Sequence, residues 1–180
     1  MVEHISYLYC NICQMTETMQ LKKHMSLVHE VSVNAPSDKV WDFLINIEKN
    51  YIAWHPKDHI LFQWTKGTAF EAGARFYAEQ YMMGVMIKYN GTISESIPGQ
   101  KISMTFSFPL SLITDKIEII IENHGAATVF RHVTHMKFRF LSRTIFKKRN
   151  INMLLDMDTH IKSEGENMKK ILENVHQQED

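Results

Sequence analysis

The sequence predicts an α+β protein in which a curved antiparallel sheet wraps around one long C-terminal helix, with two short helices after the first strand. Residues 150 to 176 carry apolar side chains at helical spacing along one face. The region from residue 60 to residue 140 reads as short strands separated by turn residues such as Pro98-Gly99. Strands that form one run, followed by a separate helix, are typical of an α+β fold.

The first strand is predicted at residues 26 to 33 and is expected to be half buried. Its two faces would carry Leu27, His29, Val31 and Val33 on one side and Ser26, Val28, Glu30 and Ser32 on the other. Ala35-Pro36-Ser37-Asp38 then opens a short helix, with Ser37 or Asp38 expected at its cap, and a second helix is expected from Ile47 to Trp54. The remaining strands are expected at residues 60–65, 74–82, 85–94, 101–107, 115–122 and 128–140.

The C-terminal helix carries two polar residues on its apolar side. Glu164 projects into the middle of the apolar arc, and His160, one turn earlier, lies at its edge. A buried carboxylate costs several kcal/mol unless it is protonated, paired or bound to a metal. The spacing His-x-x-x-Glu lets an imidazole and a carboxylate reach one cation, but it equally fits a helix-edge histidine with a glutamate paired to Lys or Arg. The apolar arc consists of Met153, Met157, Ile161, Met168, Ile171, Leu172 and Val175.

Residues 1 to 24 are predicted to be a loosely ordered extension, and residues 25 to 180 the folded domain. Cys10-x-x-Cys13 followed by His24 and His29 resembles a zinc finger, but the gap between Cys13 and His24 is shorter than the roughly 12 residues of a finger. We therefore expect the two cysteines to be free thiols in a reducing compartment.

The charge balance limits the classes of partner. Twenty Lys and Arg against 20 Asp and Glu give zero formal net charge, which argues against nucleic acid or an acidic membrane as partner. We find neither an apolar run of about 18 residues nor a signal peptide, so a cytoplasmic protein is expected. Twelve Met and ten Phe suggest a soft apolar interior that could hold a small hydrophobic or aromatic ligand. The oligomeric state stays open.

The segment VSVNAPSDKVWDFL at residues 31–44, the strand meander and the long terminal helix resemble the START-like, or polyketide-cyclase-like (SRPBCC), helix-grip superfamily. The resemblance covers the chain from about Met25 onward. It implies a cavity between the curved sheet and the long helix in which apolar ligands bind. Binders and enzymes both use this fold, so the fold does not decide the function.

Three shorter segments are similar to the metal-bearing segments of the diacetylphloroglucinol hydrolase and phloretin hydrolase family. They are YIAWHPKDH at residues 51–59, YAEQYMMG at 77–84 and HIKSEGENM at 160–168. The resemblance implies a zinc-dependent hydrolase that cleaves the carbon–carbon bond between an acyl group and a phenolic ring. The implied metal ligands are His55, Glu79, His160 and Glu164.

Several assignments stay open at this point. His59 competes with His55 as the ligand, and Glu79 could instead lie on a solvated outer face beside Arg75. His132 and His135 point to opposite sides of their strand, so at most one faces the cavity, and we expect His135.

Cleavage of an acyl-phenol needs a proton donor near the metal. The candidates for this role are His135, Asp58 and His59 next to the proposed ligand, and Tyr77 and Tyr81 beside Glu79. The expected cavity wall contains Trp54, Tyr77, Phe106, Phe108, Met157 and Ile161.

Zinc suits two imidazoles and two carboxylates best, while iron and manganese are not excluded. The leading hypothesis is therefore a zinc-dependent hydrolase of an acylated phenol or similar aromatic ketone. The alternatives are a non-catalytic carrier of a lipid or polyketide-like ligand and, third, a partner-binding module of the kind that assists chaperones.

Overall fold

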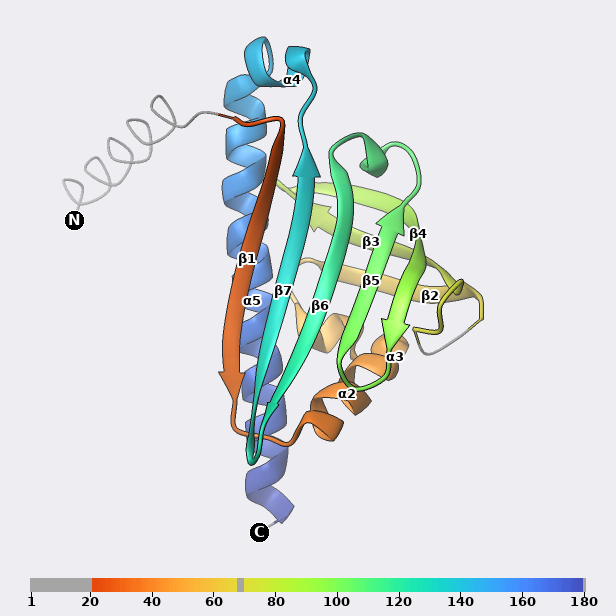
Figure 1. Ribbon diagram of the computed structural model, residues 1–180, viewed down its shortest axis with the longest axis vertical. Helices are drawn as coiled ribbons and strands as arrows, with labels where there is room; N and C mark the ends of the chain where they lie inside the picture. Colours follow the sequence, from red (N-terminus) through yellow and green to blue (C-terminus); the bar gives the residue numbers. More distant parts are fainter. Residues whose placement is uncertain (1–20, 68–69, 180) are drawn as a thin grey trace, which may run out of the picture.

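The computed structural model describes residues 21–67 and 70–179, which form one bent seven-stranded antiparallel sheet around a long helix (Figure 1). The strand order in the sheet is β1-β7-β6-β5-β4-β3-β2. The strands are β1 (His24–Val33), β2 (His59–Lys66), β3 (Arg75–Met82), β4 (Val85–Ile97), β5 (Lys101–Phe106), β6 (Thr114–His124) and β7 (Ala127–Lys137). The helices are α2 (Ser37–Ile45), α3 (Ile47–Trp54), the 3-10 turn η1 (Leu110–Leu112), α4 (Phe140–Thr144) and α5 (Lys147–Glu179). This arrangement confirms the predicted helix-grip architecture.

Helix α5 lies along the inner face of the sheet and contacts β1 most extensively. Gly165 allows the close approach, because a Cβ atom at this position would lie 2.9 Å from Cδ2 of His29 and 3.3 Å from Cγ1 of Val31. The neighbouring residue Glu164 is thereby held against the sheet and is 6% exposed. The sequence prediction that the glutamate on the apolar arc is buried is thus confirmed.

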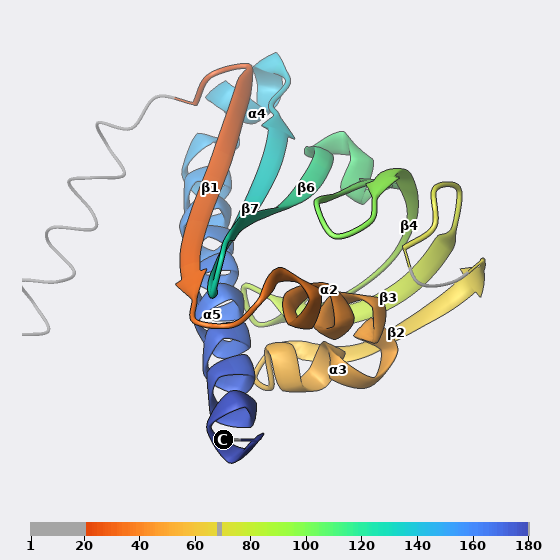
Figure 2. The ribbon, with the colours of Figure 1, turned by 60° about the horizontal axis from the view of Figure 1, so that its bottom comes forward.

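Helices α2 and α3 cover the end of the molecule at which β1 ends (Figure 2). Val40, Phe43 and Leu44 of α2 face the core, as amphipathic spacing requires. The last residue of α3, Trp54, donates a hydrogen bond from Nε1 to the backbone oxygen of Glu164 over 3.0 Å. This contact fixes the start of the α3–β2 loop against α5.

Local details differ from the sequence predictions. Pro36, and neither Ser37 nor Asp38, occupies the cap position of α2, and no side chain caps this helix. Strand β7 ends at Lys137 and not at residue 140, and the last pair of its ladder with β1 is His24 with Lys137. The chain then forms α4, which the sequence did not predict. Helix α5 begins three residues earlier than expected, at Lys147.

The first described residues already belong to the folded unit. Leu21 is buried in an apolar cluster with Met136 and Leu154, and the backbone oxygen of Lys23 accepts a hydrogen bond from Phe138. The predicted boundary at residue 24 thus falls next to a packed segment. Cys10 and Cys13 lie outside the described residues, and their thiol state stays a prediction. None of the helices in the described part of the chain is both long and apolar enough to cross a bilayer.

Candidate metal centre

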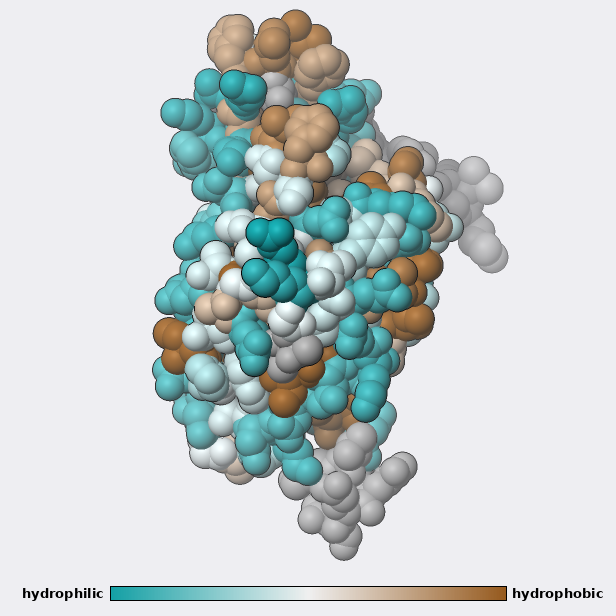
Figure 3. All heavy atoms as spheres, turned by 90° about the vertical axis from the view of Figure 1, so that its right-hand side faces the viewer, coloured by the Kyte–Doolittle hydropathy of each residue, from teal (hydrophilic) through white to brown (hydrophobic). Residues whose placement is uncertain are grey.

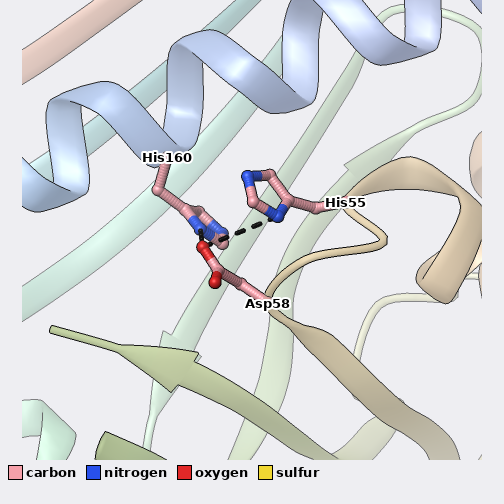
Figure 4. Close-up of side chains that lie close together, drawn as sticks. All are labelled: His55, Asp58 and His160. Carbon is pink, nitrogen blue, oxygen red and sulfur yellow. Dashed lines mark hydrogen bonds and ion pairs between the residues drawn. The ribbon is translucent and has the colours of Figure 1, made fainter. Parts of the chain in front are cut away.

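Polar side chains from three parts of the chain meet at the inner face of the sheet, on which α5 packs. His55, Asp58 and His59 come from the loop between α3 and β2 and from the first residue of β2. His160 and Glu164 come from α5, and Figure 4 shows the Asp58 carboxylate beside the rings of His55 and His160, joined to each by a dashed line. These side chains are largely withdrawn from water, so their mutual charges act at low dielectric.

The tightest group consists of His59, His160 and Glu164. The Nε2 atom of His59 lies 3.1 Å from Oε1 of Glu164 and 3.3 Å from Nε2 of His160. The distance from Nε2 of His160 to Oε1 of Glu164 is 3.5 Å. Two nitrogens and one oxygen therefore form a nearly equilateral triangle around one point.

Hydrogen bonds on the far side of each ring orient the two imidazoles. Nδ1 of His59 lies 2.8 Å from the backbone oxygen of Tyr51, and Nδ1 of His160 lies 3.2 Å from Oδ2 of Asp58. Because a carbonyl or carboxylate oxygen only accepts, both Nδ1 atoms donate and carry a proton. In the neutral rings both Nε2 atoms then present lone pairs, which is the tautomer that metal-binding histidines usually have.

The triangle has the dimensions of a metal site. Ligands at about 2.0 to 2.1 Å from zinc lie about 3.3 to 3.4 Å apart in a tetrahedral arrangement, which matches the three distances in the group. Oε2 of Glu164 and Nδ1 of His132 lie 3.2 Å apart, yet neither atom makes a hydrogen bond of acceptable geometry within the described residues. A group with two imidazoles and one carboxylate, and with a buried carboxylate oxygen still unsatisfied, fits a divalent cation.

The electrostatics favour a positive charge at the centre. Burial raises the pKa of Glu164, but the neighbouring histidines His160, His132 and His59 outweigh it and hold this pKa well below its ordinary value. Burial opposes the charged form of His160, whereas Glu164 and Asp58 together raise its pKa to about 9. In the absence of a metal, a proton on His160 supplies the cation that Glu164 requires.

His55 occupies a different position from His59. Its ring stacks on that of His160, with 4.3 Å between the ring centroids, and its Nδ1 lies 3.6 Å from Oδ2 of Asp58. Burial, followed by the charges of His160 and His59, lowers the pKa of His55. The geometry therefore favours His59 as the ligand and places His55 behind His160, where His55, Asp58 and His160 form a second group of possible ligands.

We call His59, His160 and Glu164 the metal group, because they are the candidate ligands. Two of its members, His160 and Glu164, belong to the wall of an apolar cavity of about 90 Å³. His132, His160 and Glu164 line the cavity together with apolar side chains from the sheet and α5. The volume is below the roughly 150 Å³ of an engineered cavity that binds benzene, so a substituted ring requires the wall to open. Phe106 and Leu110, which are only partly buried, belong to that wall.

A second polar group lines the cavity. The hydroxyls of Tyr51 and Tyr89 both donate to Oε1 of Gln80, over 2.7 and 2.9 Å. Burial raises the pKa of both tyrosines, which keeps them as neutral hydroxyls. The ring of Tyr51 stacks on that of His59 with 3.8 Å between centroids, so this group adjoins the metal group.

Glu79, which the resemblance implies as a ligand, is not brought to the centre. Its carboxylate accepts hydrogen bonds from Tyr77 and Lys88 over 2.5 and 3.0 Å, and neither group of possible ligands in the described residues contains it. The reason is the alternation of β3, in which Gln80 faces the cavity and Glu79 faces outward. The ion-pair partner of Glu79 is Lys88, and not Arg75 as in the alternative interpretation of the sequence.

The expected orientation of the two β7 histidines is corrected. His132 lines the cavity beside Glu164, whereas His135 hydrogen-bonds to Ser26 and Glu118 on the other face of the sheet. The alternation along β7 that separates the two residues is evident in the sequence, but its absolute direction follows only from the packing of α5.

The other predicted residues divide in the same way. Trp54, Phe106, Met157 and Ile161 line the cavity as expected. Tyr77, Tyr81 and Phe108 are not part of its lining, and Phe108 is 77% exposed. Asp58 lies next to the metal group, but its carboxylate faces His55 and His160.

Sequence reasoning missed the polar cavity group. Gln80 lies on the same face of β3 as Phe76 and Ala78, both of which are buried. Counting every second residue from Phe76 would therefore have identified Gln80 as a residue that faces the core. Tyr51 and Tyr89 carry no comparable signal, because a buried tyrosine reads as core.

No protein-family model matches the sequence, and no curated protein matches it. Solved structures do match the fold. Norcoclaurine synthase of Thalictrum flavum, solved as a point mutant with a transition-state analogue, has a TM-score of 0.66 at 13% identity, over 87% of this chain and 99% of that chain. The ZhuI aromatase/cyclase of Streptomyces sp. R1128 gives 0.63 at 12% identity, over 83% and 94%, and Ara h 8.0201 gives 0.64 at 10%, over 84% and 99%.

The chain has the START-like helix-grip fold. The matched structures of this fold include enzymes, as the names of norcoclaurine synthase and the aromatase/cyclase state. At these identities the likeness concerns the helix-grip fold alone. The function of this helix-grip protein therefore depends on its own side chains.

Proposed function

We propose that the protein is a zinc-dependent hydrolase that cleaves a carbon–carbon bond in an acylated phenol or a similar aromatic ketone. The observation that carries this proposal is the convergence of His59, His160 and Glu164 on one point in the wall of an apolar cavity. The sequence resemblance to acyl-phenol hydrolases supplies the substrate class. Iron or manganese in place of zinc would use the same ligands.

His59, His160 and Glu164 would hold the metal, with Asp58 orienting His160 and the Tyr51 carbonyl orienting His59. A bound metal ion would polarise a substrate oxygen and lower the pKa of a bound water. Glu164 and Asp58 together balance the two charges of a divalent cation. Asp58, which contacts the far side of the His160 ring, thus supplies the second negative charge that the resemblance assigned to Glu79.

The Tyr51, Gln80 and Tyr89 group would orient an oxygen substituent of the aromatic ring. Two hydroxyl donors occupy Oε1 of Gln80, and its amide nitrogen is the donor that this side chain would offer to a ligand oxygen. The hydroxyl oxygens of the tyrosines can in addition accept from a phenol. A ring with at least one hydroxyl group besides its acyl group therefore fits the cavity chemistry best.

His132 would transfer the proton that hydrolysis requires. Water adds its oxygen to the acyl carbon, the bond from that carbon to the ring breaks, and the ring carbon takes up a proton, so that a carboxylic acid and a phenol result. His132 lines the cavity next to Glu164, whereas Asp58, Tyr81 and His135 are not among the lining residues. The proposed donor is therefore His132 and none of the residues expected from the sequence.

The test uses protein loaded with zinc and a panel of acylated mono-, di- and trihydroxybenzenes, with release of the carboxylic acid as the readout. We expect turnover by the loaded protein, none after metal removal, and a loss of at least about a hundredfold in kcat for His132→Asn with zinc retained. The proposal is wrong if loaded wild-type protein leaves every member of the panel intact.

The alternative is a carrier of a hydrophobic ligand, and it rests on the apolar wall of the cavity. A carrier binds an apolar fluorescent probe equally well with and without metal, and its ligand leaves unchanged. The cytoplasm, expected from the sequence, remains the compartment that we propose for either function.

A further inference from the structure

A group of exposed apolar side chains covers one end of the molecule. We call it the α4 surface and define it by Phe140, Leu141, Ile145 and Phe146, which are 71%, 58%, 71% and 44% exposed. Figure 3 shows the brown atoms of this end gathered over α4. Single exposed apolar residues are ordinary, but four within seven positions form a continuous patch that indicates an interaction site.

Basic residues accompany the α4 surface along the chain. Arg139, Arg143, Lys147, Lys148 and Arg149 lie within the same segment, and the sequence has no Asp or Glu between Glu122 and Asp156. The guanidinium of Arg149 lies 4.8 Å from the centre of the Phe146 ring, which brings charge and apolar surface into direct contact. Although the net charge of the whole chain is zero, the end of the molecule that carries α4 is thus strongly basic.

The neighbouring η1 loop extends this surface. Phe108 and Leu112 are 77% and 46% exposed. The backbone N–H of Lys137, three residues before Phe140, donates to the backbone oxygen of Ile113 over 2.9 Å. The η1 loop and the α4 segment therefore lie at the same end of the sheet. Leu110 of η1 also lines the cavity, so this end of the sheet adjoins the cavity wall.

We propose that the α4 surface docks on an anionic membrane surface. Aromatic and aliphatic side chains ringed by Lys and Arg are the combination that enters the boundary between headgroups and acyl chains while pairing with lipid phosphates. A second copy of the chain is the poorer partner, because a two-fold contact through this surface would place its basic residues against one another. The docking is independent of the hydrolase proposed above and holds equally for a carrier.

The test is co-sedimentation of the full chain with vesicles of phosphatidylcholine, with and without phosphatidylserine. We expect binding to the phosphatidylserine vesicles that is at least about tenfold tighter than to phosphatidylcholine alone and that weakens with added salt. Phe140→Ser/Ile145→Ser should reduce the binding at least about tenfold by removing apolar contacts, and Lys148→Glu/Arg149→Glu should do so by reversing charge.

Two variants at distant positions serve as matched controls. Ile52→Ser changes an apolar residue of α3 that is 55% exposed, and Lys162→Glu/Lys170→Glu reverses the same amount of charge on the far part of α5. Both should bind vesicles as the wild type does. Phe140→Trp, which keeps the surface intact, should show a blue shift of its additional fluorescence on vesicles, and this holds even where a serine variant fails to fold.

The proposal is overturned if the wild-type protein ignores phosphatidylserine vesicles, or if the control variants lose as much binding as the surface variants. It is also overturned if the surface variants abolish only self-association or the capture of an acidic protein while vesicle binding stays unchanged.

Discussion

Nε2 of His59 and Nε2 of His160 lie 3.3 Å apart, although 101 positions separate the two residues in the chain. Each ring donates its other N–H away from this contact, to the Tyr51 carbonyl and to Asp58. Two lone pairs at this distance repel unless they share a proton or a metal ion. Glu164, in contact with both nitrogens, makes the point between them a receptor for one cation.

Metal content gives the first prediction. We expect about one equivalent of zinc per chain in purified protein, measured by elemental analysis, because one set of three ligand atoms converges on one point. His160→Ala/Glu164→Ala should contain none. Glu79→Gln should keep its zinc, because Glu79 pairs with Tyr77 and Lys88 outside the cavity. Loss of zinc from Glu79→Gln would refute the arrangement of ligands described above.

The second prediction concerns the pH dependence of metal affinity. In metal-free protein the pKa of His160 is raised to about 9, so its Nε2 carries a proton at neutral pH that a metal must displace. The apparent zinc affinity should therefore increase about tenfold per pH unit from pH 7 until it levels off near pH 9. Titration calorimetry in buffers of different ionisation enthalpy should find about one proton released per zinc. An affinity that does not change over this range would contradict it.

The third prediction concerns the stability of the metal-free protein. A raised pKa of His160 means that its ion pairs stabilise the fold fully below its ordinary value of 6.5, and that this stabilisation is lost as the pH rises through about 9. The lowered pKa of Glu164 has the opposite sign, so its stabilisation is present above 4.5 and is lost at lower pH. Both contributions are complete between pH 4.5 and pH 6.5. Urea unfolding should therefore find the maximum free energy of unfolding in this range.

Removal of the buried carboxylate is the fourth prediction. Glu164→Ala should lower the free energy of unfolding of metal-free protein at neutral pH by about 3 kcal/mol, because protonated His160 and its histidine neighbours lose their buried counter-charge. The control is Glu166→Gln, at an exposed position two residues along the same helix, which should unfold at nearly the wild-type urea concentration. Equal effects of the two substitutions would show that the histidine cluster does not depend on Glu164.

The fifth prediction connects the sheet to the cavity. Gly91 pairs with Phe76 across β3 and β4, and a Cβ atom at Gly91 would lie 2.2 Å from Cζ of the Phe76 ring. Gly91→Ala should therefore force this ring toward the cavity that it lines, destabilise the fold by about 1 to 3 kcal/mol and weaken the binding of an apolar probe. Gly125→Ala has no atom within 4 Å of its added Cβ and should leave probe binding unchanged, although its positive φ of 78° makes it a control for binding only.

Much of the fold follows from the sequence because its signals are local. The apolar period of α5, the alternation of β1 and the turn at Pro98-Gly99 each depend on residues a few positions apart. Helix α4 escaped prediction because its apolar residues lie on the surface and no local pattern distinguishes them from the end of a strand.

The membership of the candidate metal centre depends on contacts between distant parts of the chain. That Glu164 and His160 share one face of a helix follows from the sequence, because a 3.6-residue period fixes this relation within one turn. The sequence did not determine whether His132 or His135, or Glu79 or Gln80, faces the cavity, because alternation defines two faces of a strand without saying which one is covered. The packing of α5 on the sheet makes that choice, and it selects His132 and Gln80.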